Sequence, residues 1–140
     1  MSLPGICLDA SVLIAHFNPG DAHHRGATQI LAEHADSQFH ASTLTLAEFY
    51  AQPAKAGAEA LGVAKAGIAA LRVTAVPVAD PERLAGLRAT TGLKMPDCCV
   101  LDAALSGPRP GAMPVATFDT ALRLAAHHLG LPVIVPDTSP

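Results

Sequence analysis

A regular alternation of short apolar runs with helix-forming segments limits the folds open to this chain more than any other feature. Continuous apolar runs indicate buried strands, and apolar residues spaced three and four apart indicate helices. The predicted strands are residues 6–9, 38–41, 73–78, 114–117 and 132–135. The predicted helices are 10–17, 21–36, a region from 44 to about 71, a segment that starts at 80, 96–106 and 119–129. This order favours an α/β fold with a parallel sheet covered by helices on both faces.

Local signals place several helix boundaries. Asp21 follows a turn and is expected to cap the helix that runs to about residue 36. Asp80, followed by Pro81, is a strong helix start. Pro53, Gly57 and Gly62 are expected to break the long region after residue 44 into two helices.

Composition describes an ordinary globular chain. With 140 residues, 50% hydrophobic and 15% charged, the chain is expected to form one domain with a substantial core. Its three cysteines, Cys7, Cys98 and Cys99, match neither a disulfide framework nor a zinc site. No stretch has the length of a membrane-spanning helix, so we expect a cytoplasmic protein without membrane association.

The net charge of −3 counts mildly against a module that holds nucleic acid by charge alone. It does not exclude an enzyme whose positive charge comes from bound metal ions.

Acidic residues recur where strands meet helices. Asp9 ends the first predicted strand in ICLDASVLI, and Glu48 lies in STLTLAEF after the second. Asp97 follows a proline in LKMPDCCVL, and Asp119 follows the fourth strand in VATFDTAL. Each has an ordinary explanation. Asp9 and Asp119 could be N-caps, Glu48 could close a capping box opened by Thr45, and Asp97 could complement the helix dipole.

Taken together, the four acids predict a metal site. The carboxyl ends of parallel strands meet at one edge of the sheet, where α/β proteins bind ligands. Four carboxylates at that edge would repel one another, and partial burial would strengthen the repulsion. Divalent cations would offset it better than helix N-termini, and Mg²⁺ prefers oxygen ligands.

At these residues the sequence resembles the PIN-domain ribonucleases, specifically the VapC-type toxins of bacterial toxin–antitoxin systems. The resemblance covers nearly the whole chain, so residues 1–140 would form a single PIN-like domain. Each motif is weak alone, but the ordered set is specific. It consists of LDASVLI with Asp9, TLAEF with Glu48, KMPDCCVLDAAL with Asp97 and ATFDTAL with Asp119.

The resemblance implies a three-layer α/β/α sandwich with a central parallel sheet. It also implies an endoribonuclease in which Asp9, Glu48, Asp97 and Asp119 bind Mg²⁺ or Mn²⁺. These ions would promote the hydrolysis of RNA phosphodiester bonds. Members of the family usually form homodimers and are inhibited by a small antitoxin protein that inserts into the active-site groove.

Three further residues are candidates for supporting roles. Ser11 and Thr117 match small hydroxyl positions that often flank the first and last acids. Their hydroxyls could form local hydrogen bonds at a helix start or contact a metal-bound water. Asp102 lies about 140° around the helix from Asp97, so it is expected to support the site or face solvent.

Other polar residues have weaker claims. Lys94 and Arg123 could contact RNA phosphate or pair with an acid of the cluster. The pair His23 and His24 is expected to face solvent, because adjacent helical residues point about 100° apart.

Three alternatives to a ribonuclease fit the sequence less well. A receiver-like signalling switch also clusters acids and Mg²⁺ at a sheet edge. It generally needs paired acids near the first strand and a lysine after the last, and this chain has neither. A phosphatase with a first-strand DxD pattern is disfavoured, because residue 11 is serine. A PIN scaffold retained only for binding is disfavoured by four intact acids.

Overall fold

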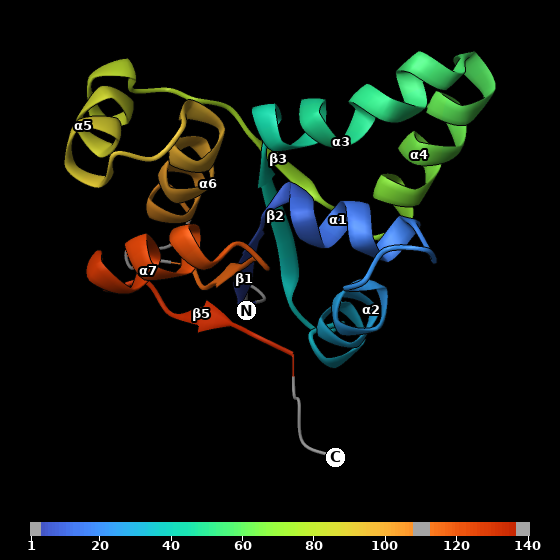
Figure 1. Cartoon of the computed structure of the whole chain (residues 1–140), viewed down its shortest axis with the longest axis horizontal. Coiled ribbons are helices and arrows are strands. Elements are labelled where there is room, and N and C mark those ends of the chain that lie inside the picture. Colours follow the sequence, from blue (N-terminus) through green and yellow to red (C-terminus); the bar gives the residue numbers. More distant parts are fainter. Residues whose placement is uncertain (1–3, 108–112, 137–140) are drawn as a thin grey trace.

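The computed structural model describes residues 4–107 and 113–136, which form a parallel sheet between two layers of helices (Figure 1). The strand order is β3-β2-β1-β4-β5, and each neighbouring pair is parallel. The strands are β1 (Gly5–Leu8), β2 (Gln38–Ser42), β3 (Thr74–Val76), β4 (Val115–Ala116) and β5 (Val133–Ile134). The sequence-based expectation of a three-layer α/β/α sandwich is therefore confirmed.

Each face of the sheet has its own hydrophobic core. The first core lies against α1 (Ala10–Phe17), α2 (His24–Glu33), α3 (Thr43–Ala56) and α4 (Ala58–Ala70). The second lies against α5 (Pro81–Thr91), α6 (Met95–Leu105) and α7 (Thr120–His128). Strand β1 serves both cores, because Ile6 and Leu8 pack into the first and Cys7 into the second. Successive side chains of a strand point to opposite faces, so a fully apolar strand is required there.

The handedness of the connections explains which helices cover which face. From β1 the chain moves to β2 and then to β3, and it returns across the sheet to β4 and β5. Parallel connections are almost always right-handed, so a reversal of direction moves the connecting helices to the opposite face. As a result α1 leaves β1 toward one face, whereas α7 leaves the neighbouring strand β4 toward the other. In open α/β sheets, ligands generally bind at the carboxyl edge between such diverging connections.

Three local predictions need correction. Helix α2 begins at His24, and the Asp21 side chain instead accepts a hydrogen bond (2.8 Å) from the His23 backbone N–H in the preceding turn. Pro53 lies inside α3 near its end, and Gly62 lies inside α4. The break falls at Gly57 alone, whose φ of 131° is a conformation that only glycine adopts readily. In the described part of the chain, no helix is both long and apolar enough to cross a membrane.

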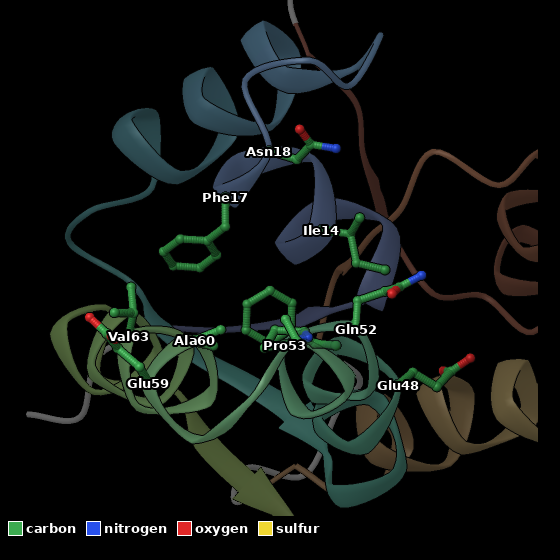
Figure 2. A pocket seen from close by; sticks show the side chains of 12 residues that line it. Ile14, Phe17, Asn18, Glu48, Gln52, Pro53, Glu59, Ala60 and Val63 are labelled. Atoms are coloured by element: carbon green, nitrogen blue, oxygen red, sulfur yellow. The ribbon is translucent and has the colours of Figure 1, made fainter.

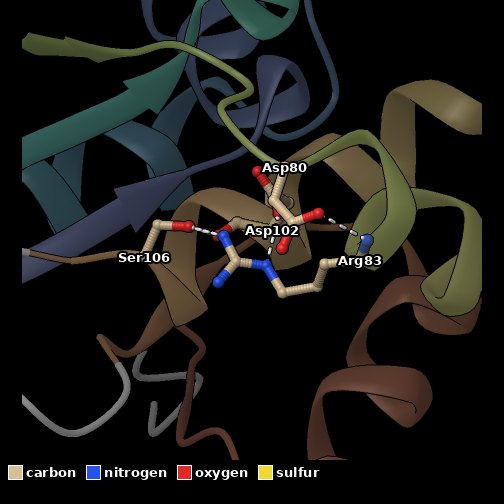
Figure 3. A network of polar contacts seen from close by, with 4 residues as sticks. All are labelled: Asp80, Arg83, Asp102 and Ser106. Carbon is tan, nitrogen blue, oxygen red and sulfur yellow. Dashed lines mark hydrogen bonds and ion pairs between the residues drawn. The ribbon is translucent and has the colours of Figure 1, made fainter.

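An ion pair between the half-exposed Arg83 and the buried Asp102 joins α5 to α6 (Figure 3). Arg83 Nε donates to Asp102 Oδ1 at 2.8 Å, and Arg83 Nη2 donates to Ser106 Oγ. The Asp102 side chain is 2% exposed and that of Arg83 is 38% exposed. Asp80 completes the network by capping α5 through the Arg83 backbone N–H at 3.1 Å. These contacts hold α5 against α6, the helix whose first turn carries Asp97.

We predict that Arg83→Met lowers the free energy of unfolding by about 3 kcal/mol, because Asp102 would remain buried without its cation. The double variant Arg83→Met/Asp102→Leu should recover most of this loss, since it removes the uncompensated charge. Urea unfolding measures both. Arg88→Met, at an arginine of the same helix whose Nη1 donates to the Leu93 backbone carbonyl at 2.8 Å in an exposed hydrogen bond, is the matched control. An Arg83→Met protein as stable as this control would contradict the assignment.

Candidate active site

The Asp9 carboxylate is the most firmly held acid at the carboxyl edge of the sheet. It is 7% exposed, and its Oδ1 accepts a hydrogen bond from the Ala10 backbone N–H at 2.8 Å. Its Oδ2 accepts one from Ser11 Oγ at 2.8 Å and one from Thr117 Oγ1 at 2.7 Å. Asp9 is thus the N-cap of α1 and also a contact between the turns that follow β1 and β4.

Both hydroxyls that donate to Asp9 also accept a hydrogen bond from the backbone. Ser11 Oγ accepts from the Phe118 backbone N–H at 3.1 Å, and Thr117 Oγ1 accepts from the Asp119 backbone N–H at 3.0 Å. A hydroxyl has one proton, and each of these donates it to Asp9. Ser11 and Thr117 thus form the hydrogen bonds that were one of their two expected roles, and a contact with a metal-bound water stays a prediction.

Helix capping accounts for the position of Asp119 but not for that of Glu48. Asp119 caps α7, where its Oδ1 accepts from the Leu122 backbone N–H at 3.0 Å. The capping box proposed for Glu48 does not form, because α3 begins earlier and is capped by Ser42 at 3.2 Å from the Leu44 N–H. Glu48 therefore lies in the second turn of α3 with no capping role.

The four carboxylates are close enough to influence one another. The pKa of Glu48 is raised by partial burial and then by the negative charges of Asp9 and Asp97. The pKa of Asp97 is raised by partial burial and then by the charges of Asp9 and Asp119. Lys94 lowers both values, which places its ammonium group on the same side. We call Asp9, Glu48, Asp97 and Asp119 the acidic cluster.

The acidic cluster is not a finished coordination shell. Among residues 4–107 and 113–136, no three His, Cys, Asp or Glu side chains are arranged as they stand to hold a metal ion. Asp9 is fixed by its hydrogen bonds, whereas Glu48 and Asp119 are largely solvent-accessible. Binding of a metal ion would therefore require rotation of the accessible side chains, such as Glu48 and Asp119.

The remaining candidates lie outside the acidic cluster. Asp102 pairs with Arg83 in the network between α5 and α6. Arg123 Nε donates to the Thr117 backbone carbonyl at 2.9 Å, which keeps this side chain beside the turn before α7. His23 is exposed as predicted, but His24 is half-buried, and its Nδ1 lies 2.8 Å from the Ala15 carbonyl oxygen.

An apolar groove adjoins the acidic cluster, and sequence analysis did not predict it. The groove has a volume of about 880 Å³ and lies between α1, α3 and α4. Figure 2 shows Ile14 and Phe17 on one side, Val63 near one end and Glu48 at the other end. Val63 is 70% exposed. In the sequence, Val63 has the same spacing from other apolar residues of its helix as a core residue would have. The sequence signal for the groove was therefore an excess of apolar positions in α4.

The chain matches the family model of the PIN domain over residues 6–128. No curated protein sequence matches it significantly.

Similar solved structures include a toxin–antitoxin complex, a VapC toxin and FitAcB. A toxin–antitoxin complex from Klebsiella pneumoniae has a TM-score of 0.70 and 22% identity, covering 94% of this chain and 98% of that one. Mycobacterium tuberculosis VapC20, a toxin that cleaves the sarcin–ricin loop, has a TM-score of 0.66 and 19% identity, covering 86% and 94%. FitAcB from Neisseria gonorrhoeae has a TM-score of 0.65 and 21% identity, covering 92% and 96%. At these identities the likeness establishes a shared fold.

The raised pKa values generate a prediction for the metal-free protein. Since the pKa values of Glu48 and Asp97 lie above their ordinary 4.5 and 3.8, the folded state binds more protons than the unfolded state just above those values. Both groups therefore weaken the fold at neutral pH, and this penalty disappears as the pH falls. We expect Glu48→Gln/Asp97→Asn to raise Tm at pH 7 by about 2 °C, a small effect because solvent screens these charges.

Thermal unfolding in EDTA at pH 7 and pH 4.5 measures this difference, and the gain should shrink at the lower pH. Asp36→Asn, at an exposed acid near the opposite edge of the sheet, is the control. A lower Tm for the double variant at pH 7 would show that these carboxylates stabilise the fold instead.

Proposed function

This chain belongs to the PIN-domain family, and from that premise we propose that it is a VapC-like endoribonuclease that depends on Mg²⁺ or Mn²⁺. The observation that carries the proposal is the gathering of four carboxylates at the carboxyl edge of the sheet, where nearby negative charges add to the burial that raises the pKa values of Glu48 and Asp97. A cluster of carboxylates that repel one another is poorly suited to stability and well suited to binding cations. Membership of the family also sets aside the receiver-like alternative.

The donor set fits a hard divalent cation. All four side chains offer carboxylate oxygens, which Mg²⁺ and Mn²⁺ accept as ligands. Asp9 Oδ2 already accepts two hydrogen bonds, so Asp9 would bind a cation through Oδ1, which accepts one. Glu48, Asp97 and Asp119 would complete the site. When bound, such ions make water nucleophilic at neutral pH and stabilise charge on the leaving oxygen.

The chain's own residues would position these groups. Ser11 and Thr117 orient the Asp9 carboxylate, and their hydrogen bonds also fix the turn that presents Asp119. The Lys94 ammonium group, beside Glu48 and Asp97, is placed to attract the phosphate of an approaching RNA. We assign no side chain as a dedicated general base.

We predict that the purified chain, freed of any antitoxin, cleaves single-stranded or loop RNA in Mg²⁺ or Mn²⁺ and stops in EDTA. Asp9→Asn and Asp97→Asn should each lower the rate at least about a hundredfold, because each removes a ligand charge from the site. Gel analysis of labelled RNA measures the rate, with Asp36→Asn as the control. Cleavage that continues in EDTA would overturn the metal mechanism, and absence of cleavage with metal bound would favour a scaffold that only binds.

We further propose that the apolar groove is the binding site of a small antitoxin protein. Ile14, Phe17 and Val63 expose apolar surface there, and one end of the groove carries Glu48 of the acidic cluster (Figure 2). A partner segment with apolar side chains for the groove and a basic side chain for Glu48 would cover both. Such a segment would inhibit the enzyme by occupying a position beside a metal-binding carboxylate.

Two further parts of the proposal concern assembly and location. We also propose a homodimer, which is the usual assembly of the VapC-type toxins that the sequence resembles, and exposed apolar side chains outside the groove, such as Leu105 and Val135, are available to such a contact. The three buried free cysteines, Cys7, Cys98 and Cys99, and the RNA substrate support a reducing cytoplasm.

For the groove we predict that Val63→Glu weakens binding of the cognate antitoxin at least about tenfold, because a charge would have to be buried in the apolar interface. RNA cleavage by the free toxin should remain unchanged. Leu124→Glu, a substitution of the same kind at a residue 57% exposed on α7, is the matched control. Calorimetry measures affinity, and light scattering records the oligomeric state of both variants. Equal affinities for the two variants would place the antitoxin elsewhere.

A further inference from the structure

An exposed aromatic stack includes Phe118, the residue directly before Asp119 in the turn that leads into α7. The His23 imidazole and the Phe118 ring are parallel, with centroids 4.4 Å apart and an interplanar angle of 7°. His23 is exposed, whereas Phe118 is half-buried against the first core. One face of the imidazole therefore covers Phe118, and the rest of the ring is accessible to solvent.

The stack is preformed by the surrounding backbone. Gly26, in the first turn of α2, lies against the Phe118 ring, where an added Cβ would be 3.4 Å from Cε1 and Cζ. Phe118 is thus confined between α2 on one side and the imidazole of His23 on another. His23 makes no side-chain capping hydrogen bond to α2, although it is the residue that precedes the helix. Its side chain is used for the stack.

The same turn that carries Phe118 also carries the acids. Phe118 lies between Thr117 and Asp119, and its backbone N–H donates to Ser11 Oγ at 3.1 Å. Ser11 Oγ donates to Asp9 Oδ2 at 2.8 Å. Two hydrogen bonds therefore connect the backbone of Phe118 to the Asp9 carboxylate. An RNA strand with its phosphate at the acidic cluster would bring a neighbouring base within reach of this turn.

We propose that the outer face of His23, supported by Phe118, is a stacking platform for one base of the RNA substrate. The inference rests on the proposed ribonuclease function and adds a subsite to it. Base stacking on an aromatic side chain contributes appreciable affinity without base-specific hydrogen bonds. It also suits a chain with nine lysines and arginines and a net charge of −3, which has few cations for the phosphate backbone.

The first test separates substrate binding from chemistry. Stacking that is equal in the bound substrate and the transition state affects KM and leaves kcat unchanged. We expect His23→Ala to raise KM for a single-stranded RNA oligonucleotide about tenfold at constant kcat. His23→Phe, which keeps an aromatic face, should stay within about twofold of the wild type. His127→Ala, at an exposed histidine of α7 that pairs with His128, is the matched control.

The second test identifies the base. Abasic nucleotides are placed one at a time along the oligonucleotide, and binding is measured by fluorescence anisotropy with Ca²⁺ in place of Mg²⁺. At one position the abasic substitution should weaken binding by the wild type about tenfold and leave binding by His23→Ala unchanged. The platform would be overturned if the abasic nucleotide at that position weakened binding equally in the wild type and in His23→Ala. It would also be overturned if His23→Ala and His23→Phe weakened binding of the unmodified RNA equally.

These outcomes distinguish the subsite from the function. Metal-dependent cleavage with a KM that does not respond to His23→Ala would refute the platform and leave the ribonuclease intact. RNA binding that depends on His23 without any cleavage would support the platform and refute the ribonuclease. Thermal unfolding of His23→Ala, expected to match the wild type within about 2 °C for an exposed side chain, excludes a folding defect.

Discussion

Strands β1 and β4 lie side by side, but the helices that follow them cover opposite faces of the sheet, and the candidate site depends on this divergence. It leaves the ends of both strands uncovered by a helix packed directly above them. The hydroxyls of Ser11 and Thr117 donate hydrogen bonds to the Asp9 carboxylate and so connect the turns that follow β1 and β4. The same contacts fix the backbone of Phe118 and Asp119. Asp9, Asp119, the two hydroxyls and the backbone of Phe118 are thus positioned by one small hydrogen-bonded unit.

The acidic cluster is a region where folding and function make opposite demands. Burial and neighbouring negative charges raise the pKa values of Glu48 and Asp97, which weakens the folded state at neutral pH, and helix N-termini and Lys94 offset only part of this cost. The rest of the molecule compensates with two well-packed cores and the ion pair between Arg83 and the buried Asp102. This ion pair keeps the charge of Asp102 away from the cluster, although both Asp97 and Asp102 lie on α6. Two acids on one helix therefore have different roles, set by the partners available to each.

Helix α3 links the acidic cluster to the apolar groove. Its Glu48 is coupled to Asp9 and Asp97, while Phe49 and Pro53 line the groove together with α1 and α4. Exposed apolar surface of this kind is uncommon on a monomeric protein unless a partner covers it. Because Glu48 contributes to both surfaces, a partner in the groove and a substrate at the cluster would compete for adjacent space.

Much of this arrangement follows from the sequence alone. The alternation of apolar runs and helices determined the parallel sheet, since buried strands and amphipathic helices have distinct periods. The location of Asp9 and Asp119 at one edge of the sheet also follows from the sequence, because the carboxyl ends of parallel strands share that edge. Sequence could not place the start of α2, where Asp21 serves a turn, or the capping of α3, where Ser42 replaced the expected Thr45. Only the tertiary structure decided that Asp102 pairs with Arg83, that Val63 lines a groove and that His23 stacks on Phe118. Each of these depends on which elements meet in space, and a helical apolar or polar residue has the same local pattern whether it faces a core, a groove or a partner.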